Sequence, residues 1–422
     1  MDVLQEFLNQ AIAKVPALLL EKVIARKLKE QGIAGKGLSR KLADHVLSGK
    51  REPLKFRSSK HTGSVTLDFN ETDADEITQA ADRFCETQLP KLLVNMAAKT
   101  SRTILKDLKS RWATENSLQS EEISEFRKRL ERRWGEPLDQ LRMLLTVSRE
   151  WFEGRHKREI SQTAHKDEEF REIIARLLAR ACQVTDEIIC LLENGFADGA
   201  MARWRTLHEI AVVSAVISQH GSSIAERYVA HQAVESKRAL DKHMECYKKL
   251  GEKPIPQREQ KKILKAYDSA IARYGKAFKY LYGWAAFHLQ KEKPTFANLE
   301  EEAGRAEMRP YYQLGSDNVH AGVKSMFFRL GLIENYTSML AGRSNAGLAE
   351  PGQHAAHTLT QLAILICLSD PTFDDLVTAE IMKKLRDEIL YNFYRVDKRL
   401  LKDDRSYRAT LINGSGAKPS DF

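Results

Sequence analysis

The stretch GAMARWRTLHEIAVVSAVIS (residues 199–218) decides the fold class, because it is apolar on almost every side. At about 100° per residue, Leu207 and Ala211 lie on one side of a helix, and Val212 and Val216 lie on the opposite side. A helix that is apolar all round is normally buried by its neighbours. We therefore predict a central helix here, with an all-α multi-helix bundle built around it.

Most of the chain shows the same helical periodicity. Apolar residues recur at steps of three and four through residues 170–192, which is typical of an amphipathic helix. The exception is PLKF (residues 53–56) and SVTLDF (residues 64–69), which predict two strands joined by a loop that contains Gly63. The expected fold class is all-α: a multi-helix bundle with a small N-terminal helical region that contains one short β-hairpin.

The sequence predicts four segments. Residues 1–115 form the N-terminal basic helical region with the hairpin, and residues 116–160 form connecting helices, which we expect to be split by GEP at Gly135 to Pro137. Residues 161–404 form the C-terminal helical bundle, and residues 405–422 form a flexible tail.

Helix ends within the bundle can also be predicted. Asn194-Gly195 is a favourable C-terminal stop, and Asp198 fits the N-cap of the following helix. Further on, Gly315-Ser316 predicts a turn, with Ser316 or Asp317 capping the next helix. His320 is then expected on the first turn of that helix.

Composition excludes several classes of protein. The 422 residues are 42% hydrophobic and 30% charged, as in soluble globular chains, and no apolar stretch approaches the roughly 20 residues of a membrane span. The five cysteines are scattered, with no C-x-x-C, and no secretory signal is visible, so we expect a cytoplasmic location. There is no phosphate-binding P-loop, dinucleotide fingerprint or hydrolase elbow, and we expect no cofactor.

Positive charge is concentrated in residues 21–61. Twelve basic and four acidic side chains give this segment +8 of the chain's net charge of +9. Such a field attracts phosphate backbones, so RNA or DNA is a predicted partner of this segment, although a solvated helical face is an equally good interpretation. The candidate nucleic-acid-binding residues are Lys27, Lys29, Arg40, Lys41, Lys50 and Arg51.

Three motifs carry a resemblance to a known family. LLENGFADGAMARWRTLHEIAVV (residues 191–213) contains R-T-x-x-E, RYVAH (residues 227–231) contains Y-x-x-H, and YYQLGSDNVHAG (residues 311–322) contains Y-x-x-x-S-x-x-V-H. Together they resemble a bacterial helical family of unknown function, over residues 165–345. The resemblance implies helical proteins from phage-defence and abortive-infection neighbourhoods. It points to seven positions: Arg205, Glu209, Tyr228, His231, Tyr312, Ser316 and His320.

These residues permit a catalytic interpretation. Helical ribonucleases of the HEPN type use an Arg and a His in R-x4-6-H, where the guanidinium stabilises charge on phosphate and the imidazole transfers a proton. Arg203 and His208 match that spacing, but the context favours Arg205 with His320, supported by Glu209. On this hypothesis the catalytic residues are Arg205, Glu209 and His320, and the supporting residues are Tyr228, His231, Tyr312 and Ser316.

Two alternatives remain open at this point. Glu209, His231 and His320 could hold a metal ion, with or without His354 and His357, although no H-E-x-x-H spacing supports it and an exposed helix start after Pro351 explains the last two histidines. In the other alternative, Arg205 and Glu209 form a buried ion pair within a structural polar network.

The sequence therefore predicts a bacterial defence-associated protein, either a nucleic-acid-binding or RNA-cleaving effector, or a non-catalytic interaction or scaffold protein. For the scaffold, the expected partner is a second copy of the chain or the product of a neighbouring defence gene.

Overall fold

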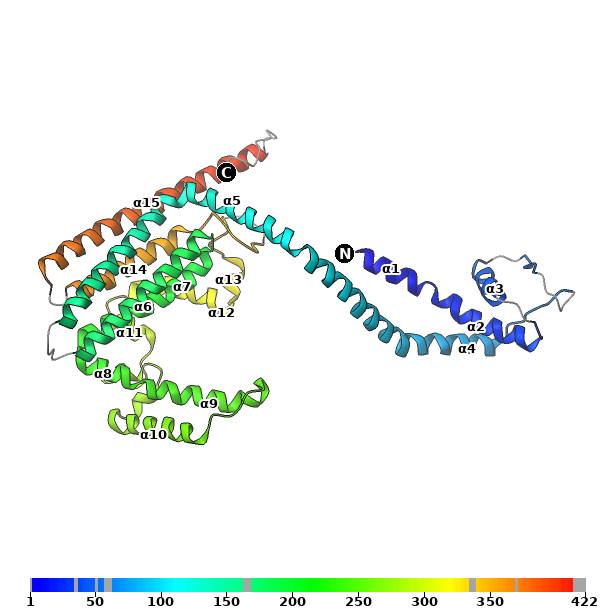
Figure 1. Ribbon diagram of the computed structural model, residues 1–422, viewed down its shortest axis with the longest axis horizontal. Helices are drawn as coiled ribbons and strands as arrows, with labels where there is room; N and C mark the ends of the chain where they lie inside the picture. Colours follow the sequence, from blue (N-terminus) through cyan, green and yellow to red (C-terminus); the bar gives the residue numbers. More distant parts are fainter. Residues whose placement is uncertain are drawn as a thin grey trace. The chain divides into compact units, whose positions relative to one another are not determined.

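The computed structural model describes residues 2–33, 37–49, 52–56, 63–161, 168–333, 339–368 and 371–412. It divides into two compact units, residues 1–119 (unit 1) and 120–422 (unit 2). Every regular element in the described ranges is helical, so the predicted all-α class is correct (Figure 1). Within these ranges, no helix combines the length and the apolar character that crossing a bilayer requires.

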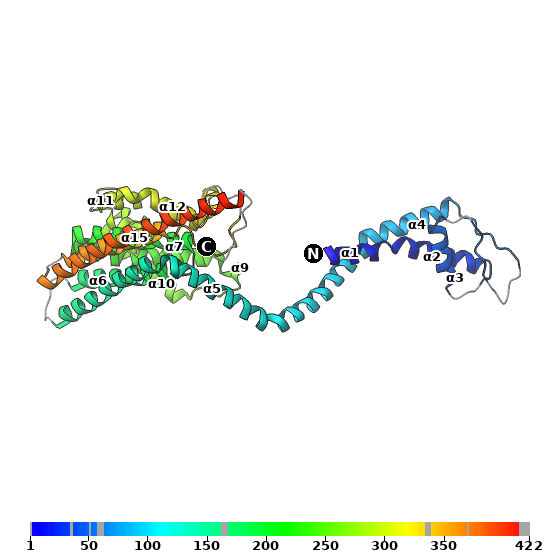
Figure 2. The ribbon, with the colours of Figure 1, turned by 90° about the horizontal axis from the view of Figure 1, so that it is seen from above.

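Unit 1 is a small helical body around α2. Its elements are α1 (Asp2–Ile12), α2 (Val15–Glu30), α3 (Leu38–Leu47), α4 (Glu71–Arg83), a π-helical turn (Phe84–Gln88) and the first part of α5 (Leu89–Ser161). Helices α2 and α4 lie side by side in both views (Figures 1 and 2). The core between α2 and α3 is formed by Ile24, Leu28, Leu38 and Ala43, which are all at most 6% exposed.

The predicted β-hairpin is wrong, because neither residues 53–56 nor residues 64–69 form a strand. Leu54 and Leu67 pack on the helical core of unit 1 instead. The backbone carbonyls that a partner strand would use are taken by side chains at the C-terminal end of α2: Lys27 Nζ donates to Asp68 O at 2.8 Å, and Nε2 of the C-cap residue Gln31 donates to Thr66 O at 3.2 Å. Contacts with α2 thus replace strand pairing.

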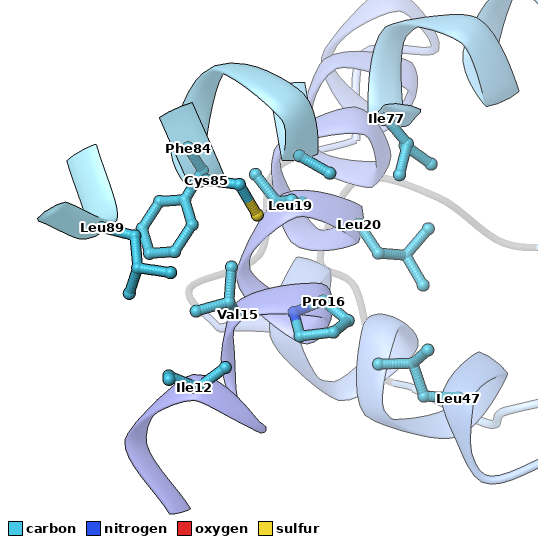
Figure 3. Close-up of a pocket in the computed structure, with 11 residues that line it drawn as sticks. Ile12, Val15, Pro16, Leu19, Leu20, Leu47, Ile77, Phe84, Cys85 and Leu89 are labelled. Atoms are coloured by element: carbon cyan, nitrogen blue, oxygen red, sulfur yellow. The ribbon is translucent and has the colours of Figure 1, made fainter. Parts of the chain in front are cut away.

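Unit 1 also contains an apolar pocket of about 370 Å³. In Figure 3, Phe84 and Cys85 come from the π-helical turn, whereas Val15 and Pro16 come from the start of α2. The full lining is Ile12, Val15, Pro16, Leu19, Leu20, Leu47, Ile77, Ala81, Phe84, Cys85 and Leu89.

Unit 2 is a bundle with α7 at its centre. After the second part of α5 come α6 (Glu168–Glu193), α7 (Ala197–His220), α8 (Ser222–Ala230), α9 (Gln232–Leu250), α10 (Gln257–Tyr274), α11 (Phe296–Glu302), α12 (Arg309–His320), α13 (Val323–Phe327), α14 (Ala349–Cys367) and α15 (Phe373–Ile412). Three short 3-10 turns lie at Lys276–Lys279, Gly283–Ala285 and Ala306–Met308. Residues 405–412 of the expected tail are therefore the end of α15.

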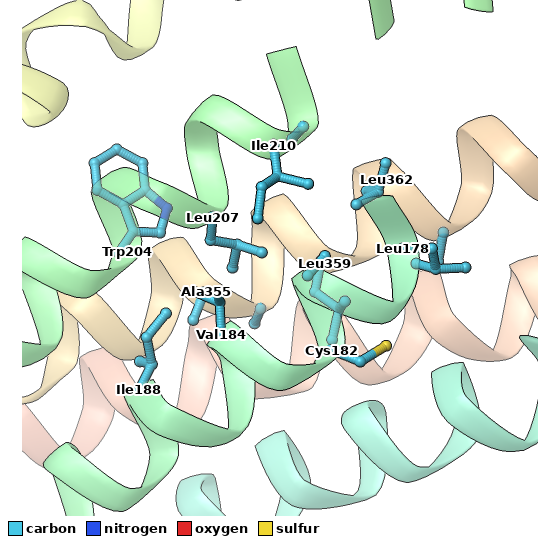
Figure 4. Packing of buried hydrophobic residues seen from close by; sticks show 14 of the residues in the cluster. Leu178, Cys182, Val184, Ile188, Trp204, Leu207, Ile210, Ala355, Leu359 and Leu362 are labelled. Atoms are coloured by element: carbon cyan, nitrogen blue, oxygen red, sulfur yellow. The ribbon is translucent and has the colours of Figure 1, made fainter. Parts of the chain in front are cut away.

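The core of unit 2 confirms the central helix. Helix α7 packs against α6, α12 and α14, and α14 packs in turn against α15. Leu207 and Val216, on opposite sides of α7, are both fully buried. Figure 4 shows Trp204, Leu207 and Ile210 of α7 beside side chains of α6 and α14.

Helix α5 runs without a break through Gly135 and Pro137, where two helices were predicted. Trp134 before the proline and Leu138 and Leu141 after it are at most 3% exposed. Burial on both sides outweighs the roughly 3 kcal/mol that an internal proline costs a helix. The expected connecting helices of residues 116–160 are thus a single helix.

Two predicted helix ends differ in detail. Helix α6 does stop before Asn194-Gly195, but α7 begins at Ala197, and the Asp198 carboxylate binds the backbone N–H of Leu330 at 2.9 Å instead of capping α7. Residues 309–320 form one helix, so the predicted turn at Gly315 is also wrong. A Cβ on Gly315 would lie 3.1 Å from Met201 O, which shows that this glycine lets α12 approach α7 closely.

Candidate functional site

Arg205, Glu209 and Tyr312 form a closed polar network between α7 and α12. Arg205 Nη2 donates to Tyr312 Oη at 2.7 Å and lies 3.0 Å from Glu209 Oε1. The Tyr312 hydroxyl donates to the same Glu209 oxygen at 2.6 Å. Arg205 and Glu209 lie one turn apart on α7 in the less favourable order for an isolated helix, and Tyr312 supplies the tertiary partner that this order requires.

The ring of Tyr312 lies in an environment that keeps its hydroxyl protonated. The guanidinium of Arg205 is 4.7 Å from the ring centroid and that of Arg309 is 5.4 Å away. Burial raises the pKa of Tyr312, and the hydrogen bond to the Glu209 carboxylate raises that pKa further. Tyr312 therefore acts as a donor to Glu209 and an acceptor from Arg205.

A second polar pair continues the network on the buried side. His208 Nε2 lies 2.9 Å from Glu300 Oε1, and both side chains are only 1% exposed. The other carboxylate oxygen of Glu300 accepts a 2.6 Å hydrogen bond from Arg309 Nη1. Glu300 and Arg309 are not among the site residues predicted from the sequence. The one signal was His208 itself, a polar residue inside the R-T-x-x-E motif where an apolar residue is expected.

Aromatic rings close this part of the site. The Trp204 ring stacks on His354 at 4.8 Å between centroids, and its indole N–H donates to the Thr358 hydroxyl at 2.9 Å. The ring of Tyr311 also packs on His354, with 4.3 Å between the ring centroids. Burial lowers the pKa of His354 to about 4, so this imidazole is neutral at pH 7. The expected exposed helix start at His354 is thus wrong, because its side chain is only 14% exposed.

The predicted catalytic residue His320 lies apart from this network. It is exposed in the last turn of α12, about two turns beyond Tyr312. In the part of the chain that the structure describes, no hydrogen bond, ion pair or ring contact joins His320 to Arg205 or Glu209. Ser316 lies between them, and its hydroxyl bonds back to the carbonyl of Tyr312 at 2.9 Å.

Tyr228 and His231 belong to a different cluster around the short turns of residues 276–285. Tyr228 packs edge-on against Trp284 at 5.1 Å. His231 is buried, and its Nε2 lies 2.9 Å from Tyr280 O and 3.1 Å from Phe278 O. Burial lowers the pKa of His231, so the neutral ring donates to these carbonyls and anchors the turn.

The two other chemistries considered from sequence do not assemble. Arg203 pairs with Glu187 on α6, whereas His208 pairs with Glu300, so the residues of the R-x4-H match have different partners. Across the described ranges, no three His, Cys, Asp or Glu side chains meet in an arrangement that could hold a metal ion.

The six candidate nucleic-acid-binding residues fall into three groups. Lys27 is only 15% exposed and binds Asp73 at 2.7 Å, and this hydrogen bond lowers the pKa of that carboxyl. Lys29, Arg40 and Lys41 are exposed and make no ion pair among the described residues. Lys50 and Arg51 lie outside the described residues.

The polar network lies within the part of the chain that matches a known family. Residues 171–336 match a family of unknown function, DUF5677. This range contains both halves of the network, from Arg205 to Tyr312, and it falls inside the 165–345 span over which the sequence resembles such a family. No curated protein and no solved structure matches the chain.

Proposed function

We propose that the chain is a non-catalytic interaction protein in which the Arg205–Glu209–Tyr312 network fixes the helices of unit 2. The observation that carries the proposal is that these three groups bond to one another, while His320 takes no part in their contacts among the described residues. General acid–base catalysis needs a proton-transfer group within hydrogen-bond reach of the reacting atoms. The protonated Tyr312 does not supply a base, because its pKa is raised.

The structural role of the network follows from where its members sit. Arg205 and Glu209 are on α7, Tyr312 is on α12, and the buried His208–Glu300 pair adds α11. Hydrogen bonds and ion pairs within the network offset part of the cost of burying its polar groups, whereas a shifted helix would leave a buried charge without its partner. The network thus favours one register of α11 and α12 on α7.

A cleavage assay tests the proposal. Labelled RNA and DNA are incubated with the purified chain and with the Arg205→Ala and His320→Ala variants, each with and without EDTA. We expect intact nucleic acid in every sample. Cleavage by the wild type that is lost in Arg205→Ala, while circular dichroism shows the variant folded, would overturn the proposal and restore the ribonuclease hypothesis.

A second function, nucleic-acid binding by unit 1, is supported by Lys29, Arg40 and Lys41, which are exposed and make no ion pair with any residue that the structure describes. We expect a gel shift that weakens steeply as salt rises. The double variant Arg40→Glu/Lys41→Glu should abolish it. The control Lys265→Glu changes an exposed lysine of unit 2 and should have little effect. Equal binding by both variants would remove this function.

The cellular setting that we propose is bacterial phage defence, on the resemblance of the three sequence motifs. Plaque counts on bacteria with and without the chain test this setting. We expect the chain to reduce the number of plaques. The Tyr312→Phe variant should reduce it less, in proportion to the amount of folded protein that the variant loses. Equal plaque counts across a panel of unrelated phages would contradict it.

A further inference from the structure

Arg305, between α11 and α12, is a buried arginine without an ion-pair partner. It is only 8% exposed, and it forms no ion pair with any residue that the structure describes. Arginine is almost never buried to this extent unless it is paired, because an uncompensated buried charge is costly. Burial lowers the pKa of Arg305, and the charge of the exposed Glu307 offsets only part of that shift. The fold therefore holds a positive charge that it does not neutralise.

The guanidinium of Arg305 has two nitrogens to spare. Its Nη1 donates to Gln361 Oε1 on α14, whereas Nε and Nη2 form no hydrogen bond among the described residues. Nε is also buried, and a buried donor without an acceptor is rare in folded proteins. Two neighbouring N–H groups of one guanidinium are the donors with which arginine binds an oxyanion in a bidentate manner.

Gln361 extends this arrangement to His357, one turn earlier on α14. Because an arginine only donates, the Gln361 oxygen faces Arg305 and its amide nitrogen faces His357. The amide donates to His357 Nε2 at 2.7 Å, so the neutral imidazole carries its proton on Nδ1. That Nδ1–H group forms no hydrogen bond in the part of the chain that the structure describes, and it is a third free donor.

Arg386 of α15 adds a second positive charge. Its Nε and Nη2 both bind Asp387 Oδ1, at 2.8 and 2.7 Å, and Nη1 makes no hydrogen bond within the described ranges. After burial, the charges of Arg386 and Arg305 are the main causes that lower the pKa of His357, and the exposed Glu307 and Asp387 oppose them less. The three basic side chains therefore lie close enough to act on one another.

We propose that Arg305, His357 and Arg386 form a binding site for the phosphate group of a small molecule. The three side chains offer four free donors, three of them on guanidinium groups, and such a set recognises an oxyanion. A phosphate group presents three acceptor oxygens and a carboxylate two, so phosphate uses more of these donors.

The position of Arg305 also limits the size of the ligand. Gly304 and Ala306, on either side of it in the chain, are exposed, so the site lies just below the surface. A small anion can reach a donor at this depth, whereas the backbone of a polynucleotide cannot. A ligand site of this kind goes beyond the proposed interaction function, which requires no small molecule.

Isothermal titration calorimetry of the full chain with inorganic phosphate, at constant ionic strength, tests the site. We expect a dissociation constant that rises at least about tenfold in Arg305→Met, which keeps a long side chain and removes the charge. Arg258→Met is the matched control, because it removes an exposed arginine of α10 in the same unit and should leave the dissociation constant unchanged. Acetate should bind more weakly than phosphate.

Three outcomes of this titration would overturn the proposal. They are no binding of phosphate to the wild type, equal binding to the wild type and Arg305→Met, and tighter binding of acetate than of phosphate.

Thermal unfolding separates a ligand site from a purely structural arginine. Phosphate should raise the melting temperature of the wild type and leave that of Arg305→Met unchanged, because a ligand stabilises only the folded state to which it binds. Without phosphate, Arg305→Met should melt at or above the temperature of the wild type, since it removes an uncompensated buried charge. A lower melting temperature without phosphate, together with an equal rise in both proteins when phosphate is added, would show that Arg305 serves the fold alone.

Discussion

Replacing His208 with leucine removes the imidazole that pairs with the buried carboxylate of Glu300. Both side chains are 1% exposed, so water cannot easily take the place of the imidazole. Removing a hydrogen-bond partner from a buried carboxylate leaves that group partly unsatisfied, which costs about 1–3 kcal/mol and more for charged groups. Glu300 keeps its second bond to Arg309, at 2.6 Å, so we expect a loss of about 3 kcal/mol.

The assay is urea unfolding followed by tryptophan fluorescence. Four of the five tryptophans, Trp134, Trp151, Trp204 and Trp284, lie in unit 2, so the signal reports mainly on that unit. A cycle with Glu300→Leu and the double variant isolates the pair, since replacing both groups leaves no unpaired carboxylate. We expect the double variant to be about 2 kcal/mol more stable than the sum of the single losses predicts.

The chain supplies a matched control on the same two helices. His220 of α7 lies 2.8 Å from Glu302 of α11, but these side chains are 24% and 36% exposed. His220→Leu should therefore cost less than about 1 kcal/mol. If the stability lost in the double variant equals the sum of the two single losses within about 0.5 kcal/mol, His208 and Glu300 are not coupled and the prediction is wrong. Equal losses of stability in His208→Leu and His220→Leu would also contradict it.

Three further predictions concern unit 2. Burial lowers the pKa of His354 to about 4, so as pH falls below 6.5 the unfolded chain binds a proton at this histidine before the folded chain does, and unit 2 should lose up to about 3 kcal/mol of stability by pH 4. His354→Gln should make the melting temperature less dependent on pH, and an unchanged pH dependence would contradict this prediction. Gly352→Ala should cost about 1–3 kcal/mol in urea unfolding, because its Cβ would lie 2.3 Å from the Phe393 ring; a neutral variant would show that α14 and α15 are not so close. Asp198→Ala should cost about 2 kcal/mol in the same assay, because it removes the bonds to Leu330 N and Arg329, and wild-type stability would count against those bonds.

The sequence predicts the central helix well because a helix that is buried on all sides has apolar residues on all its faces, and this pattern lies within one short segment. Leu207 and Val216 are apolar on opposite faces of one helix, and no long-range information is needed to expect both to be buried. The C-terminal stop at Asn194-Gly195 is equally local, since Gly195 adopts a φ of +74°.

Features that depend on long-range packing could not be predicted. Leu54 and Leu67 belong to segments whose sequences are typical of strands, yet both side chains pack on a helical core. Gly315 resembles a turn residue, but it is a glycine that permits close approach of α12 to α7. Single-residue propensities do not distinguish these uses.

The candidate site was predicted in part for the same reason. Arg205 and Glu209 are neighbours on one helix, and their shared face is visible from sequence alone. The partner of His208 is 92 residues away, and Glu300 sits in a run of three glutamates that reads as an ordinary exposed surface. Only packing of α11 on α7 identifies which glutamate is buried.

The unfolding free energy of Tyr312→Phe tests most directly whether this network serves the fold. The variant loses a 2.7 Å bond from Arg205 and a 2.6 Å bond to Glu209, while those two charged groups remain 3.0 Å apart and partly hydrated. We expect unit 2 to lose about 2 kcal/mol. Catalytic residues commonly reduce the stability of a protein, so replacing one often leaves its stability unchanged or raises it. A Tyr312→Phe variant that is as stable as the wild type, or more stable, would therefore contradict a structural role for the network.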